Sequence, residues 1–191
     1  MKKRVSITSV FIFLTHFLYA QSADNLMNEI RLVSTSEFVR LDWEILAGNT
    51  CFGIDIERST DKKNFTQIGH IAGTCGGVDI EPYFFIDSFP VKNVENCYRV
   101  ILGLQGNSSA KCLEYLEFKN GYHIRINAKQ ISFIFEDSYA KEDISFFDIA
   151  GKKVVSETIN GTTFNLDVNS FPTGIYFFKL RDLSDTKFFI P

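Results

Sequence analysis

The chain has 191 residues, of which 45% are hydrophobic and 23% are charged, a balance that excludes disordered and collagen-like proteins. Its 20 Phe and 7 Tyr against only 12 Gly and 4 Pro favour β-strands, because flat rings pack well on a pleated surface. The formal net charge of −3 disfavours a nucleic-acid-binding protein, whose affinity comes mostly from Lys and Arg contacts with phosphates.

The first residues have the pattern of a secretory signal peptide. The basic run Lys2–Arg4 precedes an apolar stretch, Val5–Tyr19, and Ala20 before Gln21 supplies a small residue at the expected cleavage point. This apolar stretch is shorter than the roughly 20 residues that a membrane-spanning helix needs. We therefore expect residues 1–20 to be removed on export, which leaves a chain that does not span the membrane.

Export changes how the four cysteines are interpreted, because thiols outside the cytoplasm usually form disulfides. No two of the four cysteines are spaced as CxxC, so a zinc site has little support. The cysteines are Cys51, Cys75, Cys97 and Cys112. Four cysteines allow three pairings. The predicted hairpins bring Cys51 near Cys75 and Cys97 opposite Cys112, and we predict these two bonds because bridged Cα atoms must lie within about 7 Å.

In the first half of the chain, short alternating segments between turn residues predict seven strands. Leu41 and Trp43, for example, alternate with Asp42 and Glu44, so that the strand has one apolar face and one polar, solvent-facing side. Several such strands can bury their apolar faces only as two sheets packed together. The predicted strands are Ile30–Ser34, Val39–Ile45, Phe52–Ser59, Phe65–Ala72, Tyr83–Asp87, Tyr98–Leu104 and Cys112–Phe118.

A polar break at Lys119–Gly121 precedes a second set of predicted strands, in which Asn160 and Gly161 have the composition of a two-residue hairpin turn. The fold class predicted is all-β, with two tandem immunoglobulin/fibronectin-like β-sandwich domains at residues 24–119 and 122–191. The predicted strands of the second domain are Tyr122–Asn127, Ile131–Glu136, Ile144–Ile149, Lys153–Ile159, Thr162–Val168, Ile175–Arg181 and Thr186–Ile190.

The second half of the chain contains three pairs of adjacent Phe residues. One face of an alternating strand cannot bury both members of such a pair. We interpret them as parts of central strands or as edges that meet a partner. The pairs are Phe146-Phe147, Phe177-Phe178 and Phe188-Phe189.

The first half of the chain resembles a fibronectin type III-like domain of secreted Bacteroidota proteins. The resemblance rests on three segments that occur in the order typical of that family: Leu41-Asp42-Trp43, Ile56-Glu57-Arg58-Ser59 and Tyr98-Arg99-Val100. The resemblance covers Asn28–Phe118. It implies that Trp43 and Tyr98 are large packing residues of the core, with a structural role.

Asp148–Val154 and the segment Phe171–Tyr176 resemble the C-terminal sorting domain, type A, of cargo for the type IX secretion system. Gly174 is expected to let the chain turn sharply into a strand. The resemblance implies handling by the type IX machinery, removal of the sorting domain, and a location at the cell surface or outside the cell. The residues that match the sorting motif are Gly151, Lys152, Gly174, Ile175, Tyr176 and Lys187.

A competing interpretation remains open, because the chain departs from that family in two places. The segment Phe118–Gly121 has no proline, and the chain ends in Phe189-Ile190-Pro191 instead of basic residues. In this second interpretation the domain is retained, and the protein is a structural subunit of an outer-membrane or periplasmic complex.

Catalytic and metal-binding patterns are weak in this sequence. His70 and His123 have no partners at the spacing of a metal or nucleophile site. Asp55 and Glu57 share a strand face and leave open a third interpretation, a small glycan-binding or hydrolytic protein. Acidic loop clusters without a calcium-loop motif are Asp79, Glu81 and Asp87, and Glu136, Asp137, Glu142 and Asp143.

The sequence therefore predicts an exported, non-catalytic interaction protein without a cofactor, a metal ion or catalytic residues. Its partner is expected to be the type IX secretion machinery or an envelope protein complex, not nucleic acid. Function is expected to lie in loop and edge surfaces.

Overall fold

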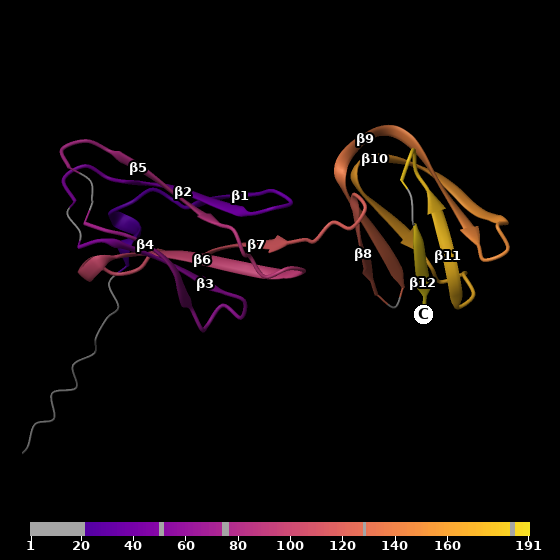
Figure 1. The fold of residues 1–191 in the computed structure, drawn as a ribbon, viewed down its shortest axis with the longest axis horizontal. Coiled ribbons are helices and arrows are strands. Elements are labelled where there is room, and N and C mark those ends of the chain that lie inside the picture. Colours follow the sequence, from indigo (N-terminus) through magenta and orange to yellow (C-terminus); the bar gives the residue numbers. More distant parts are fainter. Residues whose placement is uncertain (1–21, 50–51, 74–76, 128, 184–185) are drawn as a thin grey trace, which may run out of the picture.

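The computed structural model describes residues 22–49, 52–73, 77–127, 129–183 and 186–191. These residues form two bodies of β-structure joined by a short connection (Figure 1). In the described part of the chain, helix is limited to two 3-10 turns, Ala23–Asn25 and Gly103–Gln105. None of the described helices is long and apolar enough to cross a membrane. The all-β prediction is confirmed.

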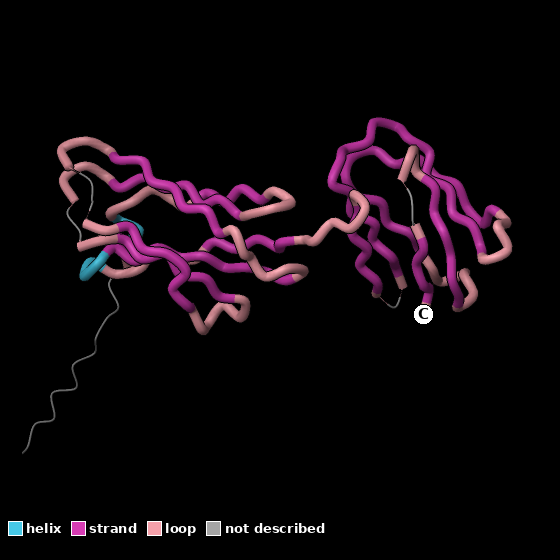
Figure 2. The backbone as a smooth tube through the Cα atoms, in the orientation of Figure 1, coloured by secondary structure: helices cyan, strands magenta, loops and turns pink. Residues whose placement is uncertain are grey.

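The first body consists of two sheets that pack face to face, as predicted (Figure 2). One sheet has the strand order β1-β2-β5, and the other has the order β4-β3-β6-β7. The strands are β1 (Arg31–Ser34), β2 (Val39–Ile45), β3 (Ile54–Ser59), β4 (Thr66–Ile71), β5 (Glu81–Asp87), β6 (Val94–Leu102) and β7 (Lys111–Tyr115).

Alternation explains the core of the first body. Along β2 every second side chain is buried, and Trp43 and Leu41 meet Ile56 and Val100 from the opposite sheet. Tyr98 is also completely buried, so Trp43 and Tyr98 are core residues, as their family resemblance implies. Burial of side chains of this size contributes roughly 1.5–3 kcal/mol each.

The second body is one five-stranded sheet in which β10, β9, β11 and β12 follow in order and β8 also pairs with β9. Its two longest strands curve, so that the sheet faces itself (Figure 1). Phe133 in the first half of β9 thus packs on Phe178 and Phe188, with ring centroids 5.1 Å away in both cases. The strands are β8 (Tyr122–Ile126), β9 (Gln130–Asp148), β10 (Lys153–Asp167), β11 (Gly174–Lys179) and β12 (Lys187–Ile190).

The predicted turn at Asn160 and Gly161 is wrong. Both residues lie inside β10, opposite Ala140 and Tyr139 of β9, so that two predicted strand pairs are merged into two long strands. The register shifts on either side of them, and Gly161 has a φ of 103°. Such bulges let a paired ribbon bend without ending, which is why a turn-like dipeptide occurs within a strand.

The two bodies have separate cores, because the first cluster of buried side chains ends at Tyr115 and the second begins at Tyr122. The connection is anchored to the first body at Glu117, whose backbone N–H donates to Asn93 Oδ1 at 2.9 Å. Arg125 of β8 reaches back to Glu114 of β7 at 2.5 Å. The domain bounds given above remain predictions, and this separation of cores is consistent with them.

Candidate functional site

The first sorting-motif pair, Gly151 and Lys152, lies in the turn between β9 and β10. Asp148 Oδ1 accepts hydrogen bonds from the backbone N–H groups of Ala150 and Lys152, both at 2.9 Å. Gly151 has a φ of 77°, a left-handed conformation that glycine adopts without steric cost. The sequence Asp-x-x-Gly-Lys therefore specifies a closed turn that joins the two long strands.

Tyr176 is buried and contacts the segment that leads into β11. Its hydroxyl donates to the backbone carbonyl of Pro172 at 2.8 Å, and its ring packs edge-on against Phe171. The ring also lies 6.0 Å from that of Phe188 on β12. Tyr176 thus ties the Phe171–Tyr176 segment to the core, which is a structural role.

The role predicted for Gly174 is wrong. Its φ is outside the left-handed region, and a Cβ built on it would only make ordinary contact with Tyr176 Cε2 at 3.8 Å. The hydrogen-bonded turn before β11 lies earlier, where the Phe171 N–H donates to the Val168 carbonyl at 3.0 Å. Glycine is therefore not required by the backbone at this position.

Ile175 and Lys187 lie on the outer surface of the second body. Ile175 pairs with Phe189 across β11 and β12, and Phe177 pairs with Lys187. On its other side Phe177 pairs with Phe147 of β9. We call this surface the outer aromatic face and define it as Phe147, Ile175, Phe177 and Phe189 with Lys153, Lys179 and Lys187.

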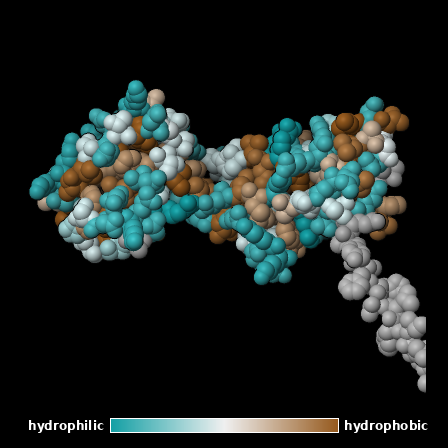
Figure 3. All heavy atoms as spheres, turned by 180° about the vertical axis from the view of Figure 1, so that it is seen from behind, coloured by the Kyte–Doolittle hydropathy of each residue, from teal (hydrophilic) through white to brown (hydrophobic). Residues whose placement is uncertain are grey.

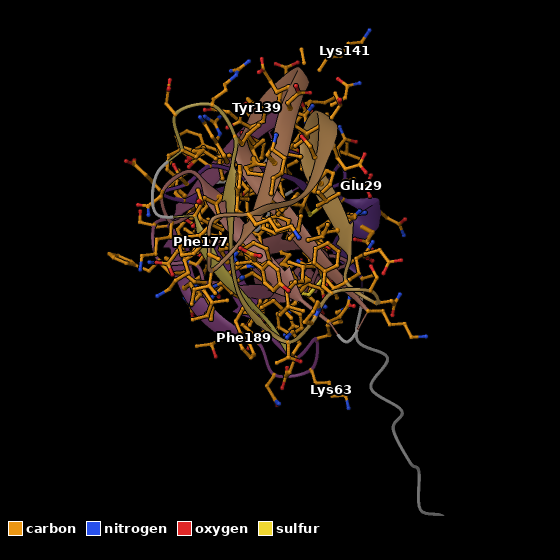
Figure 4. All side chains as sticks on the ribbon, turned by 90° about the vertical axis from the view of Figure 1, so that its right-hand side faces the viewer. Glu29, Lys63, Tyr139, Lys141, Phe177 and Phe189 are labelled. Atoms are coloured by element: carbon orange, nitrogen blue, oxygen red, sulfur yellow. A yellow bond between two sulfur atoms is a disulfide. The ribbon has the colours of Figure 1, made fainter. Side chains whose placement is uncertain are left out.

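The outer aromatic face is exposed to solvent at Ile175, Phe177 and Phe189, of which Phe177 and Phe189 are labelled in Figure 4. Figure 3 shows hydrophobic residues at the surface of both bodies, between hydrophilic ones. Phe189 is 50% exposed, Ile175 37% and Phe177 36%, whereas Phe146, Phe178 and Phe188 are buried on the inner side. The Lys153 ammonium lies 6.0 Å from the centre of the Phe147 ring. Exposed apolar side chains gathered on one face, with charges around them, are typical of a binding surface.

The two carboxylates proposed as an acid-base pair are each held by a different partner. Asp55 Oδ1 lies 2.5 Å from His70 Nδ1 and also accepts from Gln67. Glu57 is bound by both Nε and Nη2 of Arg99 at 2.6 Å. The two acids do share one face of β3, as predicted, but these contacts direct them to separate pairs.

The other candidate ligands are dispersed. His70 lies on β4 and His123 on β8, where its Nδ1 is 3.3 Å from the Glu117 carbonyl oxygen. Asp87 is buried against Arg58 and is therefore withdrawn from the acidic loop cluster to which it was assigned. Glu142 pairs with Arg181, and this contact holds the pKa of Glu142 below its usual value.

Cys97 and Cys112 form the predicted disulfide, on residues directly opposite each other in β6 and β7. Glu95 is close to both sulfur atoms, but sulfurs bonded to each other are not thiolate ligands for a metal. The predicted Cys51–Cys75 bond, the signal peptide and its Ala20–Gln21 cleavage point lie outside the described residues.

Sequence reasoning did not assign the lysines of the outer aromatic face to one surface, and it singled out only Lys187, as a sorting-motif residue. A usable signal existed in the Phe pairs, because strand alternation turns one member inward and the other outward. Only the pairing register shows that Phe147 and Phe177 lie side by side, with Lys153 and Lys187 at the ends of their row.

Comparison with known proteins identifies the second body. Residues 118–190 match the family described as secretion system C-terminal sorting domain. This part of the chain is therefore a type IX secretion sorting domain. No curated protein matches the chain.

Among solved structures, the chain is similar to the crystal structure of chicken CNTN1 FN1-FN3 domains. The identity is 11% and the TM-score 0.31, over 81% of this chain. The chain spans 60% of the length of that structure.

Proposed function

Because residues 118–190 form a sorting domain, we propose that the protein is type IX cargo that binds another molecule through its first body and has no catalytic role. In this proposal residues 24–119 are the interaction module that is delivered. Residues 122–191 serve as the sorting and docking module, and delivery ends at the cell surface or outside the cell. The match to the sorting-domain family is the observation that carries the proposal.

The contacts of the polar residues in the first body support a non-catalytic role. A general acid or base must exchange protons with a substrate, but Asp55 and Glu57 are engaged by His70 and Arg99. Arg99 is itself held, because its guanidinium carbon lies 4.1 Å from the centre of the Phe65 ring. These contacts favour the binding module over the hydrolytic alternative.

Mass spectrometry of cell envelope and culture fractions tests the proposal. We expect the full chain to be exported and the exported form to lack the second body, whereas a variant without residues 122–191 should remain inside the outer membrane. An intact C terminus in the envelope, bound to other proteins, would contradict the proposal and favour a subunit that retains its sorting domain.

A binding measurement distinguishes the interaction-module proposal from the third interpretation, a small glycan-binding or hydrolytic protein. Exchange of both acids, Asp55→Asn with Glu57→Gln, should leave glycan-array profiles unchanged in the interaction-module proposal. Glycan binding by the wild-type chain that this double variant abolishes would contradict it. The Asp42→Asn with Glu44→Gln variant, on β2 of the other sheet of the same body, removes the same two charges and is the matched control.

A further inference from the structure

The outer aromatic face has a regular order across four strands. One row across the strands consists of two aromatic rings flanked by two lysines. In order across the sheet these residues are Lys153, Phe147, Phe177 and Lys187. Ile175 and Phe189 form the neighbouring apolar row. The third row consists of Lys179, Ser145 and Ser156. These paired positions contain three lysines and no acid, so the face is basic as well as apolar.

The same face ends at an open sheet edge. Among the described strands, β12 pairs with β11 alone. The Phe178 N–H donates to the Thr186 carbonyl, and hydrogen-bonded pairs alternate along antiparallel strands. It follows that Lys187 and Phe189 direct their N–H and C=O groups away from β11. These two residues thus offer backbone partners at the edge and side chains on the outer aromatic face.

We propose that β12 accepts an extended segment of a partner protein as an added strand. In this mode main-chain hydrogen bonds supply affinity, and alternate side chains supply specificity. The residues of the added strand that face Lys187 and Phe189 are two positions apart. The lysine selects an acidic side chain and Phe189 selects an aromatic or aliphatic one, so that the partner motif is an acid and an apolar residue separated by one residue.

Other occupants satisfy these observations less well. A lipid surface has no aligned backbone donors and acceptors for Lys187 and Phe189. A second copy paired through β12 would bring a second set of lysines to the same face, and like charges on neighbouring strands repel. The inference rests on the proposed function only for the source of the segment, which would be a protein that handles the sorting domain during export.

Peptide binding to the purified full chain tests the inference in vitro. The probe is a synthetic strand peptide that contains Glu and Ile two positions apart, separated by Thr, and the matched peptides replace Glu by Lys or Ile by Pro. We expect the Glu peptide to bind and to slow amide exchange at Lys187 and Phe189. The Lys and Pro peptides should bind at least about tenfold more weakly, through repulsion and through lost backbone donors.

Variants locate the binding. Phe189→Ser and Lys187→Glu should each weaken binding of the Glu peptide by about tenfold, while Phe89→Ser, at a still more exposed ring of the first body, should change it by less than about twofold. Equal binding of the Glu and Lys peptides, no binding of any peptide, or protection elsewhere would overturn the inference. So would self-association through β12, or binding of anionic vesicles in place of the peptide.

Analysis of cell envelope and culture fractions distinguishes failure of the strand-addition inference from failure of the proposed function. If the chain is exported and processed but binds no peptide, the strand-addition inference is wrong and the cargo proposal stands. If the peptide binds but the chain is never exported, the cargo proposal is wrong and the edge remains a binding site.

Discussion

Tyr98 and Asp87 join the two sheets of the first body, because the Tyr98 hydroxyl on β6 donates to Asp87 Oδ2 at the end of β5, 2.9 Å away. Arg58 Nη1 donates to the same oxygen at 2.7 Å. Burial and the neighbouring Asp87 carboxylate raise the pKa of Tyr98 well above its usual value. The hydroxyl is therefore a permanent donor, and the buried carboxylate is always paired.

Removal of that hydroxyl should destabilise the first body. Tyr98→Phe leaves one hydrogen bond of Asp87 unmade, and we expect the free energy of unfolding in urea to fall by about 1–2 kcal/mol. Tyr83→Phe is the matched control, since the Tyr83 hydroxyl forms no hydrogen bond with the described residues. Equal stability of Tyr98→Phe and wild type would show that the sheet-to-sheet bond contributes nothing.

Gly69 and Phe85 mark a close approach between the sheets of the first body. A Cβ at Gly69 would lie 2.2 Å from Phe85 Cε2, closer than atoms can approach. We expect Gly69→Ala to lower the free energy of unfolding by about 1–3 kcal/mol, as overpacking does. Gly77→Ala, where a Cβ meets open space, is the control.

A double-mutant cycle identifies the cause of that loss. Phe85→Leu removes part of the ring, so Gly69→Ala should cost less in the Phe85→Leu background than in wild type. Additive effects of the two substitutions would contradict direct contact between them.

Phe133 tests whether the two bodies unfold separately. It is fully buried between Phe146, Phe178 and Phe188, so Phe133→Ala should destabilise the second body by about 3–5 kcal/mol. Calorimetry should show two transitions, of which only one shifts. Phe89→Ala, at an exposed ring, should move neither. A single transition shifted as a whole would show that the bodies unfold together.

Asp24 connects the start of the described chain to the turn before β7 and predicts a dependence on pH. Hydrogen bonds from the Ser109 hydroxyl and backbone N–H hold the pKa of Asp24 below its usual value of 3.8. A lowered pKa in the folded state means that the contribution is present above pH 3.8 and is lost as the pH falls through the folded value.

Urea titrations at two pH values measure this contribution. Asp24→Asn should be less stable than wild type at pH 7, by no more than about 0.5 kcal/mol because the carboxylate is exposed. The difference should disappear well below pH 3.8, where the wild-type carboxyl is protonated. Asp79→Asn, at another exposed acid, serves as the control. A difference that persists in acid would contradict the assignment to ionised Asp24.

The first body could be predicted closely because its strands are short and their alternation is local. β2 begins and ends at the predicted residues, and its apolar face is the buried one. The Cys97–Cys112 pair also follows from a hairpin of adjacent strands. In the second body, Asn160 and Gly161 have the local chemistry of a turn, but buried Ile159 and Tyr139 keep β9 and β10 paired past them.

The order of residues along the chain determined the sorting-domain pattern of residues 118–190, the strand content and the inward position of one Phe in each pair. The last two depend only on neighbours one or two positions apart. Tertiary structure decided that Phe147, Phe177 and Phe189 gather with three lysines on one face, which ends at the open edge of β12. The register between distant strands creates that face, and long-range packing, which no local pattern encodes, sets the register.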